Sequence, residues 1–321
     1  MQKLRWLNKN LAVSIPAFLL LGLLTGLLWP MQWLGVLIAP LTLLMVYPMM
    51  VGLQPKQLLQ KGDGSVQFWA TGINFILIPL IAFVLGKLFF SGQPELALGL
   101  LLTALLPTSG MTISWTGFAK GNVPAAIKLT VVGLLLGSLL TPFYVHFLLG
   151  AELPMNLGLV FGQILLFVAI PLGAGQLTRT LLLRRYGQEC FRQSIGPNFP
   201  PFSTLGVLGI VFVAMALQAK NLLQSPVLVL YIFVPLLLLY AINFTVSTLV
   251  ARKTQSRGNG IALVYGTVMR NLSIALALSM TAFGEAGAPA ALLIALAYII
   301  QVQSAAWYVK LTGWLFPQDK E

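Results

Sequence analysis

The chain has 321 residues, of which 58% are hydrophobic and only 8% are charged, and its mean hydropathy is +0.90. A soluble domain carries about 25% charged residues, so one globular core could not hide this apolar surplus. The composition excludes an ordinary soluble protein and predicts an all-α polytopic membrane protein. One Cys and one His leave no intrachain disulfide and no soft metal site.

Apolar stretches long enough to cross a membrane, which takes about 20 residues, recur along the whole chain. The first follows a basic N-terminus like a signal sequence, but no small-residue cleavage site follows it, so we predict a retained helix. The ten predicted spanning helices cover residues 11–29, 33–53, 66–90, 96–118, 123–150, 156–183, 202–218, 227–250, 261–283 and 288–316.

The placement of charge orients these helices. With the N-terminus in the cytoplasm, most of the 19 Lys and Arg residues fall in cytoplasmic segments, and only Lys87 and Lys220 fall outside. The positive-inside rule describes this bias. We therefore predict an integral protein of a bacterial-type plasma membrane with both termini cytoplasmic. Orientation and contact with anionic membrane lipid are sufficient to explain the +12 net charge, and we do not expect nucleic-acid binding.

Residues 117–127 and 282–292 resemble each other and join the fourth helix to the fifth and the ninth to the tenth. In each, a proline (Pro124, Pro289) lies near the first turn of the following helix, where its missing N–H is harmless. An offset of five helices is odd, so the two halves would have opposite orientations. This predicts a 5+5 inverted repeat, a design typical of secondary transporters, with coincidence as the alternative for so short a match.

The fourth span is interrupted. Pro107 removes a backbone hydrogen bond and Gly110 adds flexibility, so we predict a broken helix there. The hydroxyl groups of Thr108, Ser109 and Thr112 are candidate solute contacts. Alternatively, they bond back to carbonyl groups that the break has freed.

The ninth span contains Arg270 about ten residues, or about 15 Å, from either end, too deep to snorkel. An ionisable residue at this depth indicates a functional site. No carboxylate falls inside an apolar span, so we expect the partner of Arg270 to be an anionic solute. Thr267, Asn271 and Ser273 flank it, and the N-termini of broken helices suit an anion.

Lys128 is the other cation within a span. Because we expect no acidic side chain at its depth, it is a candidate solute contact, with snorkelling to the cytoplasmic surface as the alternative. Asn74 in the third span and Gln303 in the tenth are further candidates, for which helix packing is an equally good explanation. The same two explanations apply to Gln301, Ser304, Asn243 and Ser247.

These features resemble the bile acid:sodium symporter superfamily, with local motifs of its arsenite-permease branch. The resemblance covers nearly the whole chain and rests on residues 74–79, 107–110, 120–122 and 269–271, and on residues 45–50 for the arsenite branch. It implies that broken helices 4 and 9 cross. It also implies a panel domain of helices 1, 2, 6 and 7 (about 11–53 and 156–218) and a core domain of helices 3–5 and 8–10 (about 66–150 and 227–316).

The family's sodium contacts are altered. Gly266 stands where sodium symporters have Glu, Arg270 stands where they have Gln, and Asn74 replaces a helix-3 Gln. Ile113 replaces an Asn, although Thr130 keeps a sodium-binding Thr. A guanidinium in the site would repel sodium. The resemblance therefore implies that conventional sodium coupling is lost and that Arg270 acts as a tethered cation.

The arsenite branch carries a Cys and a Glu at positions that correspond to Thr108 and Ser273. Thiolate chemistry for arsenite is therefore absent from the crossing, although arsenical-resistance efflux is the alternative function. The leading hypothesis is a secondary active or facilitative transporter that moves an anionic solute by alternating access. We expect that the chain is not an enzyme and uses no cofactor, because the sequence contains no set of catalytic residues and no phosphate-binding glycine loop. It carries no signal of an oligomeric state.

Overall fold

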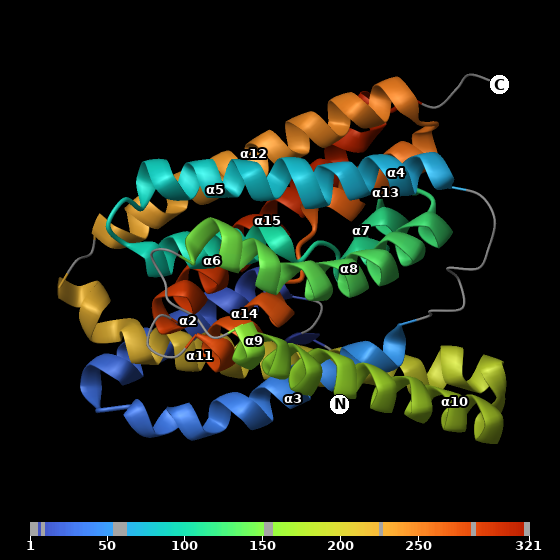
Figure 1. Ribbon diagram of the computed structural model, residues 1–321. Coiled ribbons are helices and arrows are strands. Elements are labelled where there is room, and N and C mark those ends of the chain that lie inside the picture. Colours follow the sequence, from blue (N-terminus) through green and yellow to red (C-terminus); the bar gives the residue numbers. More distant parts are fainter. Residues whose placement is uncertain are drawn as a thin grey trace. The chain divides into compact units, whose positions relative to one another are not determined.

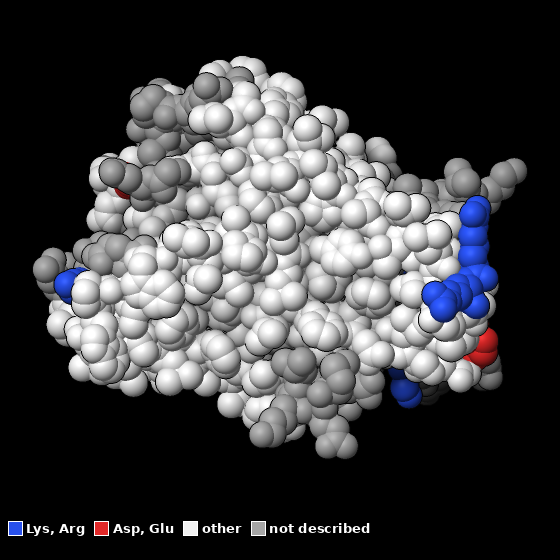
Figure 2. All heavy atoms as spheres, turned by 90° about the horizontal axis from the view of Figure 1, so that it is seen from below, with Lys and Arg blue, Asp and Glu red and all other residues white. Residues whose placement is uncertain are grey.

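The computed structural model describes residues 6–7, 10–53, 63–150, 157–224, 227–283 and 287–317. Within them every named element is helical (Figure 1), and six helices are long and apolar enough to cross a membrane. On the face that Figure 2 shows, Lys, Arg, Asp and Glu gather at the rim of a broad uncharged surface. The predicted all-α membrane protein is thereby confirmed. Ten spans, their orientation and the inverted repeat stay predictions, and residues 284–286 of the second repeated segment lie outside the described residues.

The chain divides into two compact units. The first comprises Met1–Leu53, Pro154–Val229 and Ser273–Ala295, and the second comprises Gln54–Leu153, Leu230–Leu272 and Leu296–Glu321. The predicted panel ranges fall in the first unit. The predicted core ranges fall in the second, except that residues 227–229 and 273–295 lie in the first. A panel and a core that move against each other stay a prediction.

In the first unit, α2 (Leu11–Leu28) and α3 (Ile38–Gly52) pack against α11 (Phe199–Gln224), and α10 (Ile170–Cys190) packs against α3. Small residues let these helices approach closely, as is usual in membranes. A Cβ on Gly26 of α2 would lie 2.3 Å from the carbonyl oxygen of Ala216 in α11. The unit also contains η1 (Gln32–Leu37), α9 (Leu157–Ile164), η4 (Leu165–Ala169), η5 (Phe191–Ile195), η6 (Gly196–Asn198) and most of α14 (Leu272–Ala282).

The polar stretch after the sixth predicted span is helical. α10 continues to Cys190, beyond the predicted end at residue 183, and Gly187 interrupts it with a φ of 78°. A left-handed backbone of this kind favours glycine, which has no Cβ to clash. The helix therefore extends past the apolar stretch that predicts it.

The second unit holds the candidate site. Its elements are α4 (Gly64–Gly72), η3 (Ile73–Leu77), α5 (Ile78–Phe89), α6 (Pro94–Leu105), α7 (Gly110–Phe118), α8 (Val123–Leu149), α12 (Val227–Thr254), α13 (Arg257–Val268) and the larger part of α15 (Gly287–Leu315). A buried apolar cluster that includes Leu129, Tyr265, Met269 and Tyr308 joins α8, α13 and α15. This packing fixes the elements on which the site is built.

The predicted third span contains a π-helical turn, η3. Pro79 has no N–H to give to the carbonyl of Phe75 four residues earlier, and the Tyr144 hydroxyl of α8 donates to that carbonyl instead. The widened turn carries Asn74, which is buried. Such π-bulges are frequent at functional sites.

Candidate functional site

The site is the place where two broken helices meet. α6 ends at Leu105 and α7 begins at Gly110, while α13 ends at Val268 and α14 begins at Leu272, which confirms both predicted breaks. Pro107 and Arg270 form an isolated antiparallel bridge. The Thr108 amide donates to the Met269 carbonyl and the Asn271 amide donates to the Leu106 carbonyl, each at 2.7 Å. Unwound backbone at membrane depth needs such partners.

Three predicted hydroxyl groups in the first break bond to the backbone. Ser109 caps α7 by accepting from the Met111 amide at 3.2 Å, and Thr112 accepts from the Ser109 amide at 3.1 Å. Thr108 Oγ1 is 2.6 Å from the Pro107 carbonyl oxygen and 3.3 Å from each of the Leu129 and Thr130 carbonyl oxygens. All three side chains therefore bond to the backbone, which was the alternative to solute binding.

α8 approaches this break closely. Thr108 has a φ of 64°, a conformation that is unusual for a β-branched residue. A Cβ added to Gly133 would lie only 2.3 Å from Thr108 Oγ1. Glycine at 133 therefore makes room for the Thr108 side chain, a requirement that the sequence alone does not reveal.

The Arg270 side chain is buried, with 2% of the residue exposed. Its Nη1 donates to Asn74 Oδ1 at 3.0 Å and to the Ala104 carbonyl at 3.1 Å. Its Nη2 is buried and has no hydrogen-bond partner among the described residues. Among the described residues, the acidic side chains that form ion pairs do so with Lys128 and Arg192, not with Arg270.

Gln301 of α15 fixes the backbone of Arg270. Its Oε1 accepts from the Arg270 amide at 2.7 Å and from the Tyr240 hydroxyl at 2.9 Å, and its Nε2 donates to the Arg270 carbonyl at 3.1 Å. The side-chain amide thus bonds both backbone groups of Arg270, as a neighbouring strand would. Tyr240 was missed in the sequence, although its spacing from Asn243 and Ser247 places the three on one face of α12.

Side-chain donors also cover the carbonyl end of α13. Asn74 Nδ2 donates to the Gly266 carbonyl and Asn243 Nδ2 donates to the Thr267 carbonyl, both at 2.9 Å. Thr267 Oγ1 donates to Ser247 Oγ at 2.6 Å. Asn74 therefore connects the end of α13 to the Arg270 guanidinium, which itself contacts the last turn of α6.

Lys128 requires a correction. We expected no acidic side chain at its depth, but its Nζ lies 3.8 Å from Asp63 Oδ2, and both side chains are largely buried. Asp63 immediately precedes α4, and its other carboxylate oxygen accepts from Asn122 at 3.3 Å. Lys128 therefore has an acidic partner at the beginning of α4.

The remaining candidates have different environments. Asn271 is buried next to the bridge, with its amide bonded to Leu106. Gln303 is exposed, in contrast to Gln301 two residues earlier. Ser273 is partly buried and belongs to the first unit. The structure thus brings Arg270, Asn74, Asn271, Thr108 and Thr267 together around the breaks, with Ser109 and Thr112 at the start of α7.

Comparison with known proteins gives the family. Acr3, an arsenical-resistance protein of Corynebacterium glutamicum, is 25% identical over 234 residues, covering 68% of this chain and 62% of that protein. Acr3 of Alkaliphilus metalliredigens is 26% identical over 255 residues, covering 71% and 70%. YocS of Bacillus subtilis, described as an uncharacterized sodium-dependent transporter, is 27% identical over 157 residues, covering 49% and 46%.

The match with the Corynebacterium protein spans less than two thirds of that relative's length. A family model described as the Sodium Bile acid symporter family matches residues 39–225. This is more than half of the chain, and it includes Asn74 and Thr108 but stops before Arg270. The chain therefore belongs to the sodium bile acid symporter family.

Proposed function

We propose that the chain moves a small anionic solute by alternating access and that Arg270 is a fixed cation in place of coupling sodium. The observation that carries the proposal is the pair of oxygens around Arg270 Nη1, namely the Ala104 carbonyl in the last turn of α6 and Asn74 Oδ1. Transporters with broken helices use unwound carbonyls and helix C-termini to coordinate sodium. A guanidinium that bonds such oxygens supplies the positive charge permanently.

Helix dipoles support the same role. The C-terminus of a helix carries about half a negative charge, and both α6 and α13 end at the crossing. Two such ends amount to about one negative charge, which the single charge of Arg270 offsets. An anion would then be attracted by the N-terminus of α7 and by the unpartnered Nη2 group.

The proposed transporter has ten spans in a 5+5 inverted repeat, with both termini cytoplasmic and a bacterial-type plasma membrane as its location. Its panel and core domains rock against each other. The two breaks, the distribution of Lys and Arg and the family membership support this arrangement. Two interrupted helices in corresponding positions of two halves are a recurrent sign of a midplane binding site.

The test is solute uptake into proteoliposomes, measured with taurocholate, small carboxylates and arsenite, each with and without sodium. The variants are Arg270→Gln and Arg270→Lys, and the control is Lys310→Gln, which also removes one cation but from an exposed position on α15. We expect transport of an anion without sodium, nearly abolished in Arg270→Gln, reduced in Arg270→Lys and unchanged in Lys310→Gln.

Two results would contradict the proposal. Sodium-independent transport that persists fully in Arg270→Gln would show that the cation is dispensable. Wild-type transport that requires sodium would show that the site still couples to it. Folded protein, verified by a single symmetrical peak in size-exclusion chromatography, is required of each variant.

Arsenical efflux is the second candidate, and the two Acr3 relatives support it. Thr108 has no thiol, and its hydroxyl group is already bonded to carbonyls. The test is growth on arsenite of cells that lack their own arsenite exporter. Rescue by the wild-type chain would favour this function, and rescue that requires Thr108→Cys would show that the missing thiol matters.

A further inference from the structure

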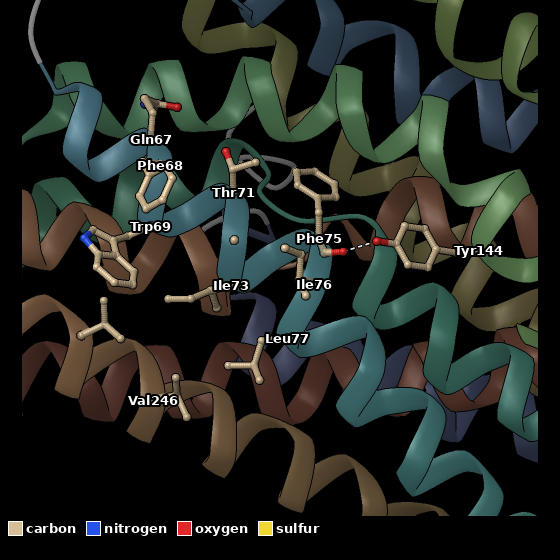
Figure 3. A pocket seen from close by; sticks show the side chains of 12 residues that line it. Gln67, Phe68, Trp69, Thr71, Ile73, Phe75, Ile76, Leu77, Tyr144 and Val246 are labelled. Atoms are coloured by element: carbon tan, nitrogen blue, oxygen red, sulfur yellow. Dashed lines mark hydrogen bonds between the residues drawn. The ribbon is translucent and has the colours of Figure 1, made fainter.

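An apolar groove lies in the second unit, and its lining does not include Arg270 or the side chains that bond it (Figure 3). Its volume is about 820 Å³, and α4, η3, α12 and one residue of α8 line it. The residues that line the groove include Gln67, Trp69, Ile73, Leu77, Tyr144 and Val246. Both long sides of the groove, Gly64–Phe89 and Val227–Thr254, are helical stretches apolar enough to span a membrane. Helices of this kind face the hydrocarbon core of a membrane.

The shape of the groove fits an extended hydrocarbon chain. Trp69, Ile73 and Leu77 lie on the side opposite Val246 (Figure 3). From Gln67 to Leu77 a helix rises about 15 Å. This is half of the roughly 30 Å hydrocarbon core of a bilayer, which is the reach of one acyl chain.

A polar residue of the lining, Gln67, lies near the beginning of α4 and projects from the other side of this helix than Trp69 (Figure 3). Nε2 and Oε1 of Gln67 are both buried, and neither has a hydrogen-bond partner among the described residues. Leaving such an amide unpaired is costly, so an occupant with both an acceptor and a donor would be favoured. An ester carbonyl and a glycerol hydroxyl next to an acyl chain supply both.

The same end of the groove is basic. α12 runs from Val246 to its last turn, which carries the exposed residues Arg252 and Lys253. Gln255 Nε2 donates to Ser65 Oγ at 2.7 Å, so this turn lies beside the beginning of α4. The nearby carboxylate of Asp63 is paired with Lys128.

We infer that the groove binds one acyl chain of an anionic phospholipid, with Gln67 bonding the glycerol region and Arg252 and Lys253 attracting the phosphate. Basic residues beside a membrane surface favour anionic headgroups, and a groove between helices adds specificity. The site is distinct from the proposed solute site, because Asn74, Ala104 and Gln301, which bond Arg270, do not line the groove.

The experiment follows the thermal midpoint of the delipidated full chain in detergent during titration with phosphatidylglycerol or phosphatidylcholine of identical acyl chains. A ligand that binds only the folded protein raises the midpoint by mass action. The variants are Val246→Trp, which fills the groove, Gln67→Leu, and the double variant Arg252→Gln/Lys253→Gln. Leu249→Trp is the matched control, because Leu249 is exposed on α12 but does not line the groove.

We expect phosphatidylglycerol to stabilise more strongly than phosphatidylcholine. The apparent affinity for phosphatidylglycerol should fall roughly 25-fold in the double variant, at roughly fivefold per cation. Stabilisation should be lost in Val246→Trp, weakened in Gln67→Leu and retained in Leu249→Trp. If Val246→Trp does not fold, Val246→Phe replaces it.

Four outcomes would overturn the inference. Equal stabilisation by the two lipids would show that the basic residues do not contact the headgroup. Full stabilisation of every groove variant that folds would show that the lipid binds elsewhere. Stabilisation by glycerol 3-phosphate equal to that by the lipid would assign the site to a soluble phosphate. Displacement of the lipid by taurocholate, together with loss of taurocholate transport in Val246→Trp, would assign the groove to the transported solute.

Discussion

Replacing Gly133 by alanine tests how tightly α8 is packed against the break in the fourth span. The new Cβ would lie 2.3 Å from Thr108 Oγ1, 3.2 Å from Thr108 Cγ2 and 3.1 Å from the Pro107 carbonyl oxygen. A rotation of the Thr108 side chain that turned Oγ1 away would give up its contacts with the carbonyl oxygens of Leu129 and Thr130. Overpacking of this kind costs about 1–3 kcal/mol, against roughly 1 kcal/mol gained from helix propensity.

A contact of 2.3 Å belongs in the upper part of the overpacking range, at about 2–3 kcal/mol, so we expect Gly133→Ala to destabilise the protein by about 1–2 kcal/mol net, measured as a lower thermal midpoint in detergent. The control is Gly173→Ala in α10, where an added Cβ meets nothing within 4 Å, and it should be neutral or slightly stabilising. In a Thr108→Ala background the cost of Gly133→Ala should shrink, with a coupling of at least about 0.5 kcal/mol. A midpoint equal to that of the wild type, or a cost that Thr108→Ala does not reduce, would refute the proposed close approach.

The remaining predictions concern side-chain contacts and are measured by the same thermal midpoint. Gln301→Leu leaves both backbone groups of Arg270 unpaired and should lower the midpoint by several degrees, whereas Gln303→Leu at an exposed position should change stability by less than about 0.5 kcal/mol. Asp63→Asn should cost more than Lys128→Met, because it takes the carboxylate charge from the more deeply buried member of the pair, which stays charged; the reverse order would contradict this. Tyr144→Phe removes the donor to the carbonyl freed by proline and should cost about 0.5–1.5 kcal/mol, and no loss would mean that water replaces the donor.

The sequence predicts the breaks because their causes are local. Pro107 cannot complete a helical hydrogen bond, and Gly110 and the hydroxyl groups beside it allow the chain to begin a new helix. The burial of Arg270 could likewise be predicted, because it lies far from both ends of an apolar stretch. What each hydroxyl contacts depends on a helix from elsewhere in the chain, and α8 supplies the carbonyls that Thr108 bonds.

Two features of the site could not be predicted from the sequence, for reasons of geometry. Depth along a helix does not show which residue stands beside it, so Asp63, which lies just before an apolar stretch, escaped notice as the partner of Lys128. Gln301 and Gln303 are two residues apart and therefore project about 200° apart on a helix with 3.6 residues per turn. The sequence does not show which face of this helix is buried and therefore cannot distinguish the two residues. In the structure Gln301 is the buried one.

The network around Arg270 explains why a positive charge at this depth need not be costly. The guanidinium lies beside the last turn of α6, and Asn74 joins it to the last carbonyls of α13, so two partial negative charges face one full positive charge. Removing a coupling ion from such a site would leave these helix ends without compensation. Gln301 holds the backbone of Arg270, and Asn74 and the Ala104 carbonyl hold its guanidinium, so these contacts do not depend on a solute. Under the proposed function, solute release would require the anion to leave Nη2 of Arg270, which has no hydrogen-bond partner among the described residues, and it would use no sodium gradient.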